Sequence, residues 1–176
     1  MDIKEFIQLS AGKWFSQRSI HHLDEDKTEN NKAEITVETL PSDLPDLVQL
    51  CQKNQINPND ICSCLKVSWD NSMDWGKPKE KGSSTMILVS DRDNPQSGKL
   101  LTVIDRKDIN VGVGSYRLDE DESLTLMIED GDTYWQERLW FASENLRLRT
   151  SLIKHNNNVT ATSFYSEIRK VAPKSK

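Results

Sequence analysis

The stretch DIKEFIQLSAGKW, residues 2–14, decides the fold that we expect for this chain. Apolar side chains within residues 2–9 recur at helical spacing, which predicts a short amphipathic helix. Gly12-Lys13-Trp14 follows directly and begins an extended run. The chain is therefore expected to pass from a short helix into its first strand at a glycine followed closely by a tryptophan.

Downstream of this segment, short runs that alternate apolar and polar residues are separated by turns rich in Gly, Pro, Asn, Asp and Ser. Ile35 and Val37 lie in one such run and predict a half-buried strand, whereas residues 24–32 (DEDKTENNK) are expected to form a polar loop. Further strands are predicted at about 61–70, 84–90, 99–105, 110–118, 123–129, 133–142, 145–153 and 159–170. A turn is expected at Arg106–Asp108. Short, evenly spaced strands indicate an antiparallel sandwich or an up-and-down barrel.

A second short helix is expected between the second and third strands. Pro41 ends the preceding strand, and Ser42 or Asp43 stands where a capping residue is needed. Apolar residues between Leu44 and Cys51 fit a helix of roughly three turns.

The first helix followed by Gly12-X-Trp14 favours the barrel over the sandwich. This arrangement is shared by lipocalin-type barrels, in which the tryptophan closes one end and the glycine lets the chain turn in beneath it. Gly112 and Gly114 lie two residues apart in one strand, as expected where a barrel strand bends sharply or a ligand comes close. We expect residues 1–176 to form a single all-β domain, a lipocalin-like (calycin) antiparallel barrel of about ten strands with one or two short helices. A barrel of this size has room for one small ligand.

Composition limits the classes of partner. The 176 residues are 29% charged and 35% hydrophobic, and the formal net charge is −5, which disfavours nucleic acid as the main partner. No apolar stretch approaches the roughly 20 residues that span a bilayer, and the N-terminal residues lack the apolar centre of a signal peptide. A cytoplasmic protein is therefore expected. The basic residues near the C-terminus are expected to form a solvated tail: Arg169, Lys170, Lys174 and Lys176.

The cysteines indicate reduced thiols and no metal site. Cys51, Cys62 and Cys64 are an odd number in a chain without an export signal. The Cys62-Ser63-Cys64 spacing is one residue too tight for the usual paired zinc ligands, and alternation along a strand explains it better.

Two tryptophans flank a polar stretch near a strand end. Trp69 and Trp75 lie on either side of Asp70-Asn71-Ser72-Met73-Asp74. Packing at the rim of the barrel explains them on composition alone. The functional interpretation is that they form flat walls for a conjugated ligand.

Arginines on one strand suggest an anion site. Arg147, Arg149 and Ser151 share one face of the predicted strand. A solvated outer face is the ordinary interpretation of this alternation with leucine. If the face points inward, two guanidinium groups along one strand suit two carboxylates of one ligand, because arginine binds carboxylates in a bidentate manner.

Two further charged residues are expected to face the interior. Glu137 shares a strand face with Trp135 and Leu139, where a carboxylate either pairs with a neighbouring arginine or orients a nitrogen-rich ligand. Arg18 shares the strand face of Trp14, so it is expected to point into the barrel, where a buried arginine would bind an anion near one end.

With these residues identified, the chain resembles the S/U-type phycobiliprotein lyases over nearly its whole length. The most specific strings are FIQLSAGKWFSQRSIHH from Phe6 to His22, ERLWFASENLRLRTS from Glu137 to Ser151, and SFYSEIRK near the C-terminus. The Trp69–Trp75 region and the run from Gly114-Ser115-Tyr116 also match.

The resemblance implies a protein that binds a phycobilin (phycoerythrobilin or phycocyanobilin) non-covalently and transfers it to a cysteine of a phycobiliprotein α or β subunit. It implies no covalently required cofactor, a homodimer, and a location in the cyanobacterial cytosol or plastid stroma. It assigns catalytic roles to Glu137, Arg149 and Glu167. It assigns ligand binding to Arg18, His21, Trp69, Trp75, Arg147, Arg149 and Ser151. His21 does not share the parity of Arg18, so a β-bulge would be needed for both to face the pocket.

Two other functions fit the same barrel. A non-catalytic carrier of a bilin or another hydrophobic ligand would use the same arginines, and a chaperone would bind the acceptor subunit without binding pigment. Architecture alone does not separate them.

Overall fold

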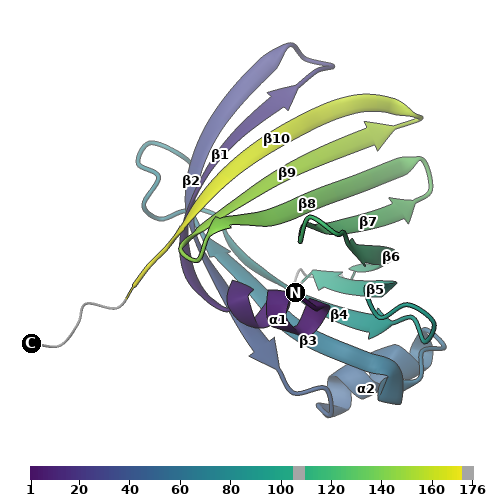
Figure 1. Ribbon diagram of the computed structural model, residues 1–176. Helices are drawn as coiled ribbons and strands as arrows, with labels where there is room; N and C mark the ends of the chain where they lie inside the picture. Colours follow the sequence, from purple (N-terminus) through teal and green to yellow (C-terminus); the bar gives the residue numbers. More distant parts are fainter. Residues whose placement is uncertain (105–109, 172–176) are drawn as a thin grey trace, which may run out of the picture.

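Ten antiparallel strands close into one barrel in the computed structural model, which describes residues 1–104 and 110–171 (Figure 1). Each strand pairs with its neighbours in the sequence, and β1 pairs with β10 to complete the barrel. The expected up-and-down barrel of about ten strands with two short α-helices is confirmed. The strands are β1 Gly12–His22, β2 Lys27–Leu40, β3 Ile61–Asp70, β4 Lys81–Ser90, β5 Ser97–Ile104, β6 Asn110–Leu118, β7 Leu124–Asp130, β8 Thr133–Ser143, β9 Leu146–His155 and β10 Asn158–Arg169.

The first helix, α1 (Ile3–Ser10), begins with a capping box. The Asp2 carboxylate accepts a hydrogen bond from the Glu5 backbone N–H, and the Glu5 carboxylate accepts one from the Asp2 N–H, each at 2.8 Å. The apolar face of the helix buries Phe6 and Ile7 against the inward side chains of the barrel. α1 therefore covers one end of the barrel interior.

The Gly12-X-Trp14 motif forms this closed end. Gly12 has a φ of +122°, a conformation that side chains rarely adopt. Trp14 is 0% exposed, and its indole N–H donates to the Ser10 carbonyl at 2.9 Å. The guanidinium carbon of Arg169 lies 4.2 Å from the Trp14 ring centroid, and its nitrogens donate to the carbonyls of the helix end.

The expected solvated tail is therefore wrong for Arg169. Its Nη1 donates to the Ala11 carbonyl at 2.8 Å, so this arginine fastens β10 to the end of α1. Lys170 forms an ion pair with Glu34 of β2. Lys174 and Lys176 lie outside the described residues, as does the predicted turn at Arg106–Asp108.

The loop expected at residues 24–32 is also mostly wrong, because Lys27–Lys32 belong to β2. These residues pair with β1 from Lys27 opposite His22 to Lys32 opposite Gln17. Most of them are exposed, so this part of the strand has no alternation of apolar and polar side chains to reveal it. Backbone pairing with β1 forms the strand without that signal.

The second helix, α2 (Pro45–Lys53), lies outside the barrel near the start of β3, and the short 3₁₀ helix η1 (Pro58–Asp60) follows it (Figure 1). The prediction that Ser42 or Asp43 caps α2 is wrong. Leu44 occupies the N-cap position and makes no side-chain capping hydrogen bond, while Pro45 supplies the first helical residue. α2 is held by packing, because Leu47 and Cys51 join an apolar cluster on the outer side of the barrel wall.

At the glycines of β6, where a sharp bend or a nearby ligand was expected, the structure shows close contact with the adjacent strands instead. A Cβ added to Gly114 would lie 1.9 Å from the carbonyl oxygen of Met127 on β7. A Cβ added to Gly112 would lie 2.8 Å from the Thr102 methyl carbon on β5. Only glycine lets the adjacent strands approach this closely.

Candidate functional site

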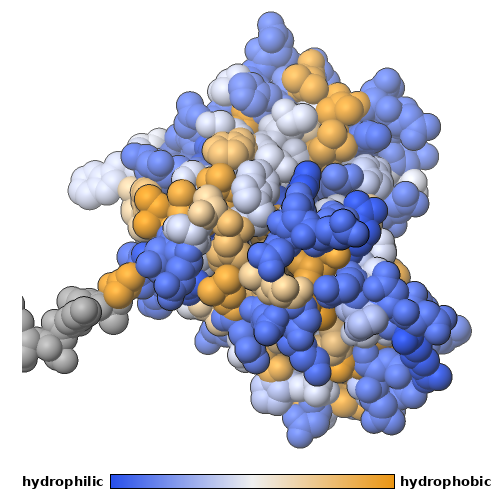
Figure 2. Space-filling model, viewed as in Figure 1, coloured by the Kyte–Doolittle hydropathy of each residue, from blue (hydrophilic) through white to orange (hydrophobic). Residues whose placement is uncertain are grey.

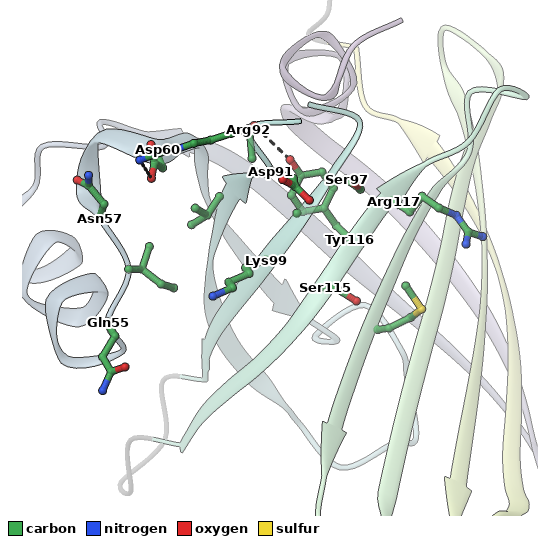
Figure 3. Close-up of a pocket in the computed structure, with 15 residues that line it drawn as sticks. Gln55, Asn57, Asp60, Asp91, Arg92, Ser97, Lys99, Ser115, Tyr116 and Arg117 are labelled. Atoms are coloured by element: carbon green, nitrogen blue, oxygen red, sulfur yellow. Dashed lines mark hydrogen bonds and ion pairs between the residues drawn. The ribbon is translucent and has the colours of Figure 1, made fainter. Parts of the chain in front are cut away.

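Two of the hollows in the described part of the chain differ sharply in position, since one lies on the outside of the barrel and the other inside it. The larger, about 600 Å³, is a groove on the outside of the barrel between the end of α2 and strands β5 and β6 (Figure 3). Gln55, Lys99 and Ser115 line it, and Arg92 and Asp60 at its edge form an ion pair at 3.2 Å. None of the site residues expected from the sequence lies in this groove, so it is not the candidate site.

The smaller hollow lies inside the barrel at the end covered by α1. Its volume is about 60 Å³, and most of its lining is apolar and comes from α1, β2, β3, β4 and β7. One side is charged, where Glu137, Arg147 and Arg149 project from β8 and β9. The interior therefore combines an apolar wall with a concentrated set of charges.

These charges form a buried charge cluster of four residues: Glu137, Arg147, Arg149 and Glu167. Arg147 Nε donates to Glu167 at 2.6 Å. Arg149 bridges both carboxylates, with Nη1 2.9 Å from Glu137 and Nη2 2.9 Å from Glu167. The Glu167 side chain is 0% exposed. Removing so many charges from water is costly unless each is paired, and here each one is.

The environments of the two carboxylates differ. Burial raises the pKa of Glu137, and its single partner Arg149 only partly opposes this effect. Burial also acts to raise the pKa of Glu167, but Arg149 and Arg147 outweigh it and hold the pKa below its ordinary value. Glu137 is therefore the carboxylate of the cluster that takes up a proton more readily.

Strand register explains how the cluster forms. Arg147 lies directly opposite Glu167 in the β9–β10 pair, and Glu137 lies opposite Ser151 in the β8–β9 pair. The arginine face of β9 points inward, so the solvated alternative is wrong. The salt-bridge alternative for Glu137 is correct in this structure, because Arg149 neutralises it. Ser151 is 9% exposed on the same inward face.

A tyrosine that the sequence analysis missed connects this cluster to Arg18. Tyr165 lies opposite Arg18 on one side and opposite Arg149 on the other. The guanidinium carbons of Arg149 and Arg18 lie 3.8 and 5.8 Å from its ring centroid. Its position two residues before Glu167 on the inward face was the available signal. Within the described chain, Arg18 has no carboxylate partner.

The remaining predicted residues are placed differently. Trp69 faces inward, packs against the core, and lies on Gly82, whose added Cβ would be 2.3 Å from the indole Cζ2. Trp75 is 90% exposed in the loop after β3, away from the cavity. The β1 register continues without a bulge from Trp14 to His22, so His21 is exposed and lies near Thr28, with Nδ1 3.2 Å from the threonine hydroxyl. The structure brings neither Trp75 nor His21 to the charge cluster.

A closed barrel with this interior is similar to a solved lyase. The S-type phycobiliprotein lyase CPES from Guillardia theta is 28% identical to this chain, with a TM-score of 0.83, and the match covers 98% of this chain and 95% of that one. The barrel therefore has the same fold as an S-type phycobiliprotein lyase.

The sequence comparisons agree. A family model described as CpeS-like protein matches residues 2–170, and the chain belongs to this family. A chromophore lyase CpcS/CpeS of Thermosynechococcus vestitus is 41% identical over 169 residues, which cover 96% of this chain and 93% of the relative. The phycocyanobilin lyase subunit CpcS of a Picosynechococcus strain is 38% identical, with 96% and 86% covered. Among the described residues, no helix has the length and apolar character needed to cross a membrane.

Proposed function

We propose that this chain binds a phycobilin non-covalently inside its barrel and attaches it by a thioether bond to a cysteine of a phycobiliprotein subunit. The observation that carries the proposal is the buried charge cluster, placed beside an aromatic and apolar wall in a barrel of the CpeS-like family. The relatives named above are lyases, which confirms the expectation of an enzyme of this class.

The size of the interior limits where the pigment can lie. The hollow under α1 holds about 60 Å³, whereas pockets for drug-sized ligands have about 300–1,000 Å³. The bilin therefore occupies the part of the barrel beyond the charge cluster, away from α1. Arg18 and Tyr165 face inward on β1 and β10, and Trp69 packs on the inward side of β3. The Arg18 guanidinium can therefore meet a propionate while the aromatic rings lie along the conjugated system.

In the proposal the charge cluster also positions the two carboxylates, Glu137 and Glu167. Arg147 and Arg149 already pair with carboxylates of the chain, so they orient Glu137 and Glu167 rather than bind both propionates. Glu137 is placed to pair with a protonated pyrrole nitrogen or to supply its proton, because burial keeps its pKa raised.

The transfer step is an addition. The acceptor thiolate forms a C–S bond at the ethylidene carbon of ring A, the π-electron pair moves into the ring system, and the bilin takes up one proton to balance the one that the thiol loses. Nothing is oxidised, reduced or released. Protonation of the bilin makes the ethylidene a better electrophile, and a rigid pocket limits which thiol can reach it.

The test is to titrate the purified protein with phycocyanobilin and phycoerythrobilin separately, follow absorbance, and then add α or β subunits. A bilin adduct of the subunit that survives denaturation supports the proposal. A spectral change without any adduct indicates a carrier, and subunit binding without a spectral change indicates a chaperone. Arg18→Gln is expected to weaken pigment binding, whereas Arg138→Gln on the outer face of β8 is the matched control.

We also propose that the chain forms a homodimer in the cyanobacterial cytosol or plastid stroma. Apolar side chains interrupt the polar surface over β8 to β10 (Figure 2). On β10, Phe164 and Ile168 are 46% and 53% exposed, and exposed apolar patches are typical of protein–protein contact surfaces. Sedimentation of wild type and Phe164→Glu tests this part: a wild-type monomer contradicts it.

A further inference from the structure

Asn31 on β2 has a buried amide nitrogen that finds no hydrogen-bond partner in the described part of the chain. Its Nδ2 has no hydrogen-bond acceptor among the described residues, although the atom is shielded from solvent. Asn31 shares the inward parity of Ala33 and Ile35, which pack in the core of the barrel. A buried donor left unpaired is unfavourable and calls for an explanation, such as a ligand that supplies the acceptor.

Asn31 lies in a row of uncharged and cationic side chains that contains no carboxylate. In the register of the barrel, Asn31 is opposite Arg18, which is opposite Tyr165, which is opposite Arg149. Directly opposed residues on one sheet face have Cβ atoms about 4.5–5.5 Å apart, so their side chains are neighbours. Arg149 Nε is a second buried nitrogen without a partner in the described chain. The row therefore carries unused N–H groups on two of its four members.

The charge balance on this part of the wall favours an anion. Arg147 and Arg149 are paired with the two carboxylates of the charge cluster. Among the described residues Arg18 makes no ion pair with a carboxylate, which leaves its positive charge uncompensated. The next inward carboxylate on β2, Glu29, is paired with Lys27 at 2.6 Å and so does not neutralise Arg18. The uncompensated charge is therefore at Arg18, beside the unpartnered Asn31 amide.

We propose that Asn31 and Arg18 form a subsite for one carboxylate of the bound ligand. The amide N–H and the guanidinium donate to the same acid group, and the Tyr165 ring positions the guanidinium between β2 and the charge cluster. Because the asparagine side chain is neutral, it adds a hydrogen-bond donor to the subsite without neutralising the Arg18 guanidinium. This inference rests on the proposed function, in which the carboxylate is a propionate of the phycobilin.

The test compares the free acid of phycocyanobilin with its dimethyl ester in absorbance titrations. Asn31→Leu removes the donor and is expected to weaken binding of the free acid by about one to two orders of magnitude, the loss typical of one hydrogen bond to a charged group. Asn31→Asp adds repulsion and pairs with Arg18, so it is expected to weaken binding further. Binding of the ester is expected to change much less in both variants, because esterification removes the charge that the subsite recognises.

Asn30→Asp is the matched control, because Asn30 lies on the outer face and its Oδ1 accepts from Ser19 Oγ at 2.8 Å. It introduces the same charge one residue away and is expected to leave both titrations unchanged. Urea unfolding establishes whether each variant is folded. If Asn31→Asp does not fold, the titration of Asn31→Leu alone tests the subsite.

The outcomes separate the two proposals. If wild type binds neither bilin, the proposed function is wrong. If wild type binds phycocyanobilin and folded Asn31→Leu binds the free acid equally well, the subsite is refuted while the proposed function stands. Equal losses for acid and ester also overturn the subsite, since they indicate a general effect on the pocket.

Discussion

Glu167→Gln is the most informative test of the buried charge cluster. The substitution keeps the size of the side chain and removes its charge. Arg147 and Arg149, at 2.6 and 2.9 Å from the carboxylate, would then share only Glu137. One guanidinium group would be left without an opposite charge in a site from which water is excluded.

The expected loss of stability follows from this geometry. Removing one partner of a buried ion pair costs about 3–5 kcal/mol, against a total stability of about 5–15 kcal/mol for an ordinary domain. With a urea m-value of about 2 kcal/mol/M, the unfolding midpoint should fall by about 2 M. The double variant Arg147→Met, Glu167→Leu removes a whole pair and leaves Arg149 with Glu137, so it should be more stable than Glu167→Gln.

The assay is urea unfolding followed by tryptophan fluorescence at neutral pH and then at lower pH. The folded-state pKa of Glu167 lies below its ordinary value of 4.5. Its stabilising contribution is therefore fully present above about pH 4.5 and is lost as the pH falls through the folded-state pKa. The difference in urea unfolding midpoint between wild type and Glu167→Gln should therefore become smaller as the pH is lowered. A Glu167→Gln midpoint equal to that of wild type at neutral pH, or a double variant less stable than the single one, would refute this reasoning.

Three further predictions concern the aromatic residues and the thiols. Gly82→Ala places a Cβ 2.3 Å from the Trp69 ring, so the indole must move, and pigment binding measured by absorbance should weaken in a protein that still folds. Trp75→Ala should change the free energy of unfolding in urea by no more than about 0.5 kcal/mol, because the side chain is 90% exposed; a larger loss would mean that Trp75 packs against the fold. Burial raises the pKa of Cys64 to about 12, so iodoacetamide at pH 8 should label Cys64 only after unfolding. Rapid labelling of Cys64 in the native protein would contradict this prediction.

Much of the fold could be predicted because its signals are local. Asp2 and Glu5 cap α1 within one turn, and Gly12 with Trp14 marks the entry into β1. The prediction failed at Lys27–Lys32, where an exposed strand has no buried face and therefore no alternation.

The candidate site could be predicted only in part. Alternation places Arg147 and Arg149 on one face of β9, but it does not say which face points inward. Tyr165 was missed because its importance depends on Arg18, which lies opposite it only after β1 and β10 close the barrel. Trp75 looked equivalent to Trp69 in sequence, yet one is exposed and the other packs in the core.

The sequence by itself determined most of the strands, although not the exposed start of β2, and it determined which side chains share a strand face and that a glycine and a tryptophan close one end. Those properties depend on neighbours within a few residues, where the two-residue period of a strand operates. Tertiary structure alone decided that Glu167 pairs with both arginines and that Asn31 lies beside Arg18. Closure of the sheet sets the register between strands that are far apart in the chain. Because water is excluded from the interior, ion pairs there are strengthened and an unpaired buried donor is costly.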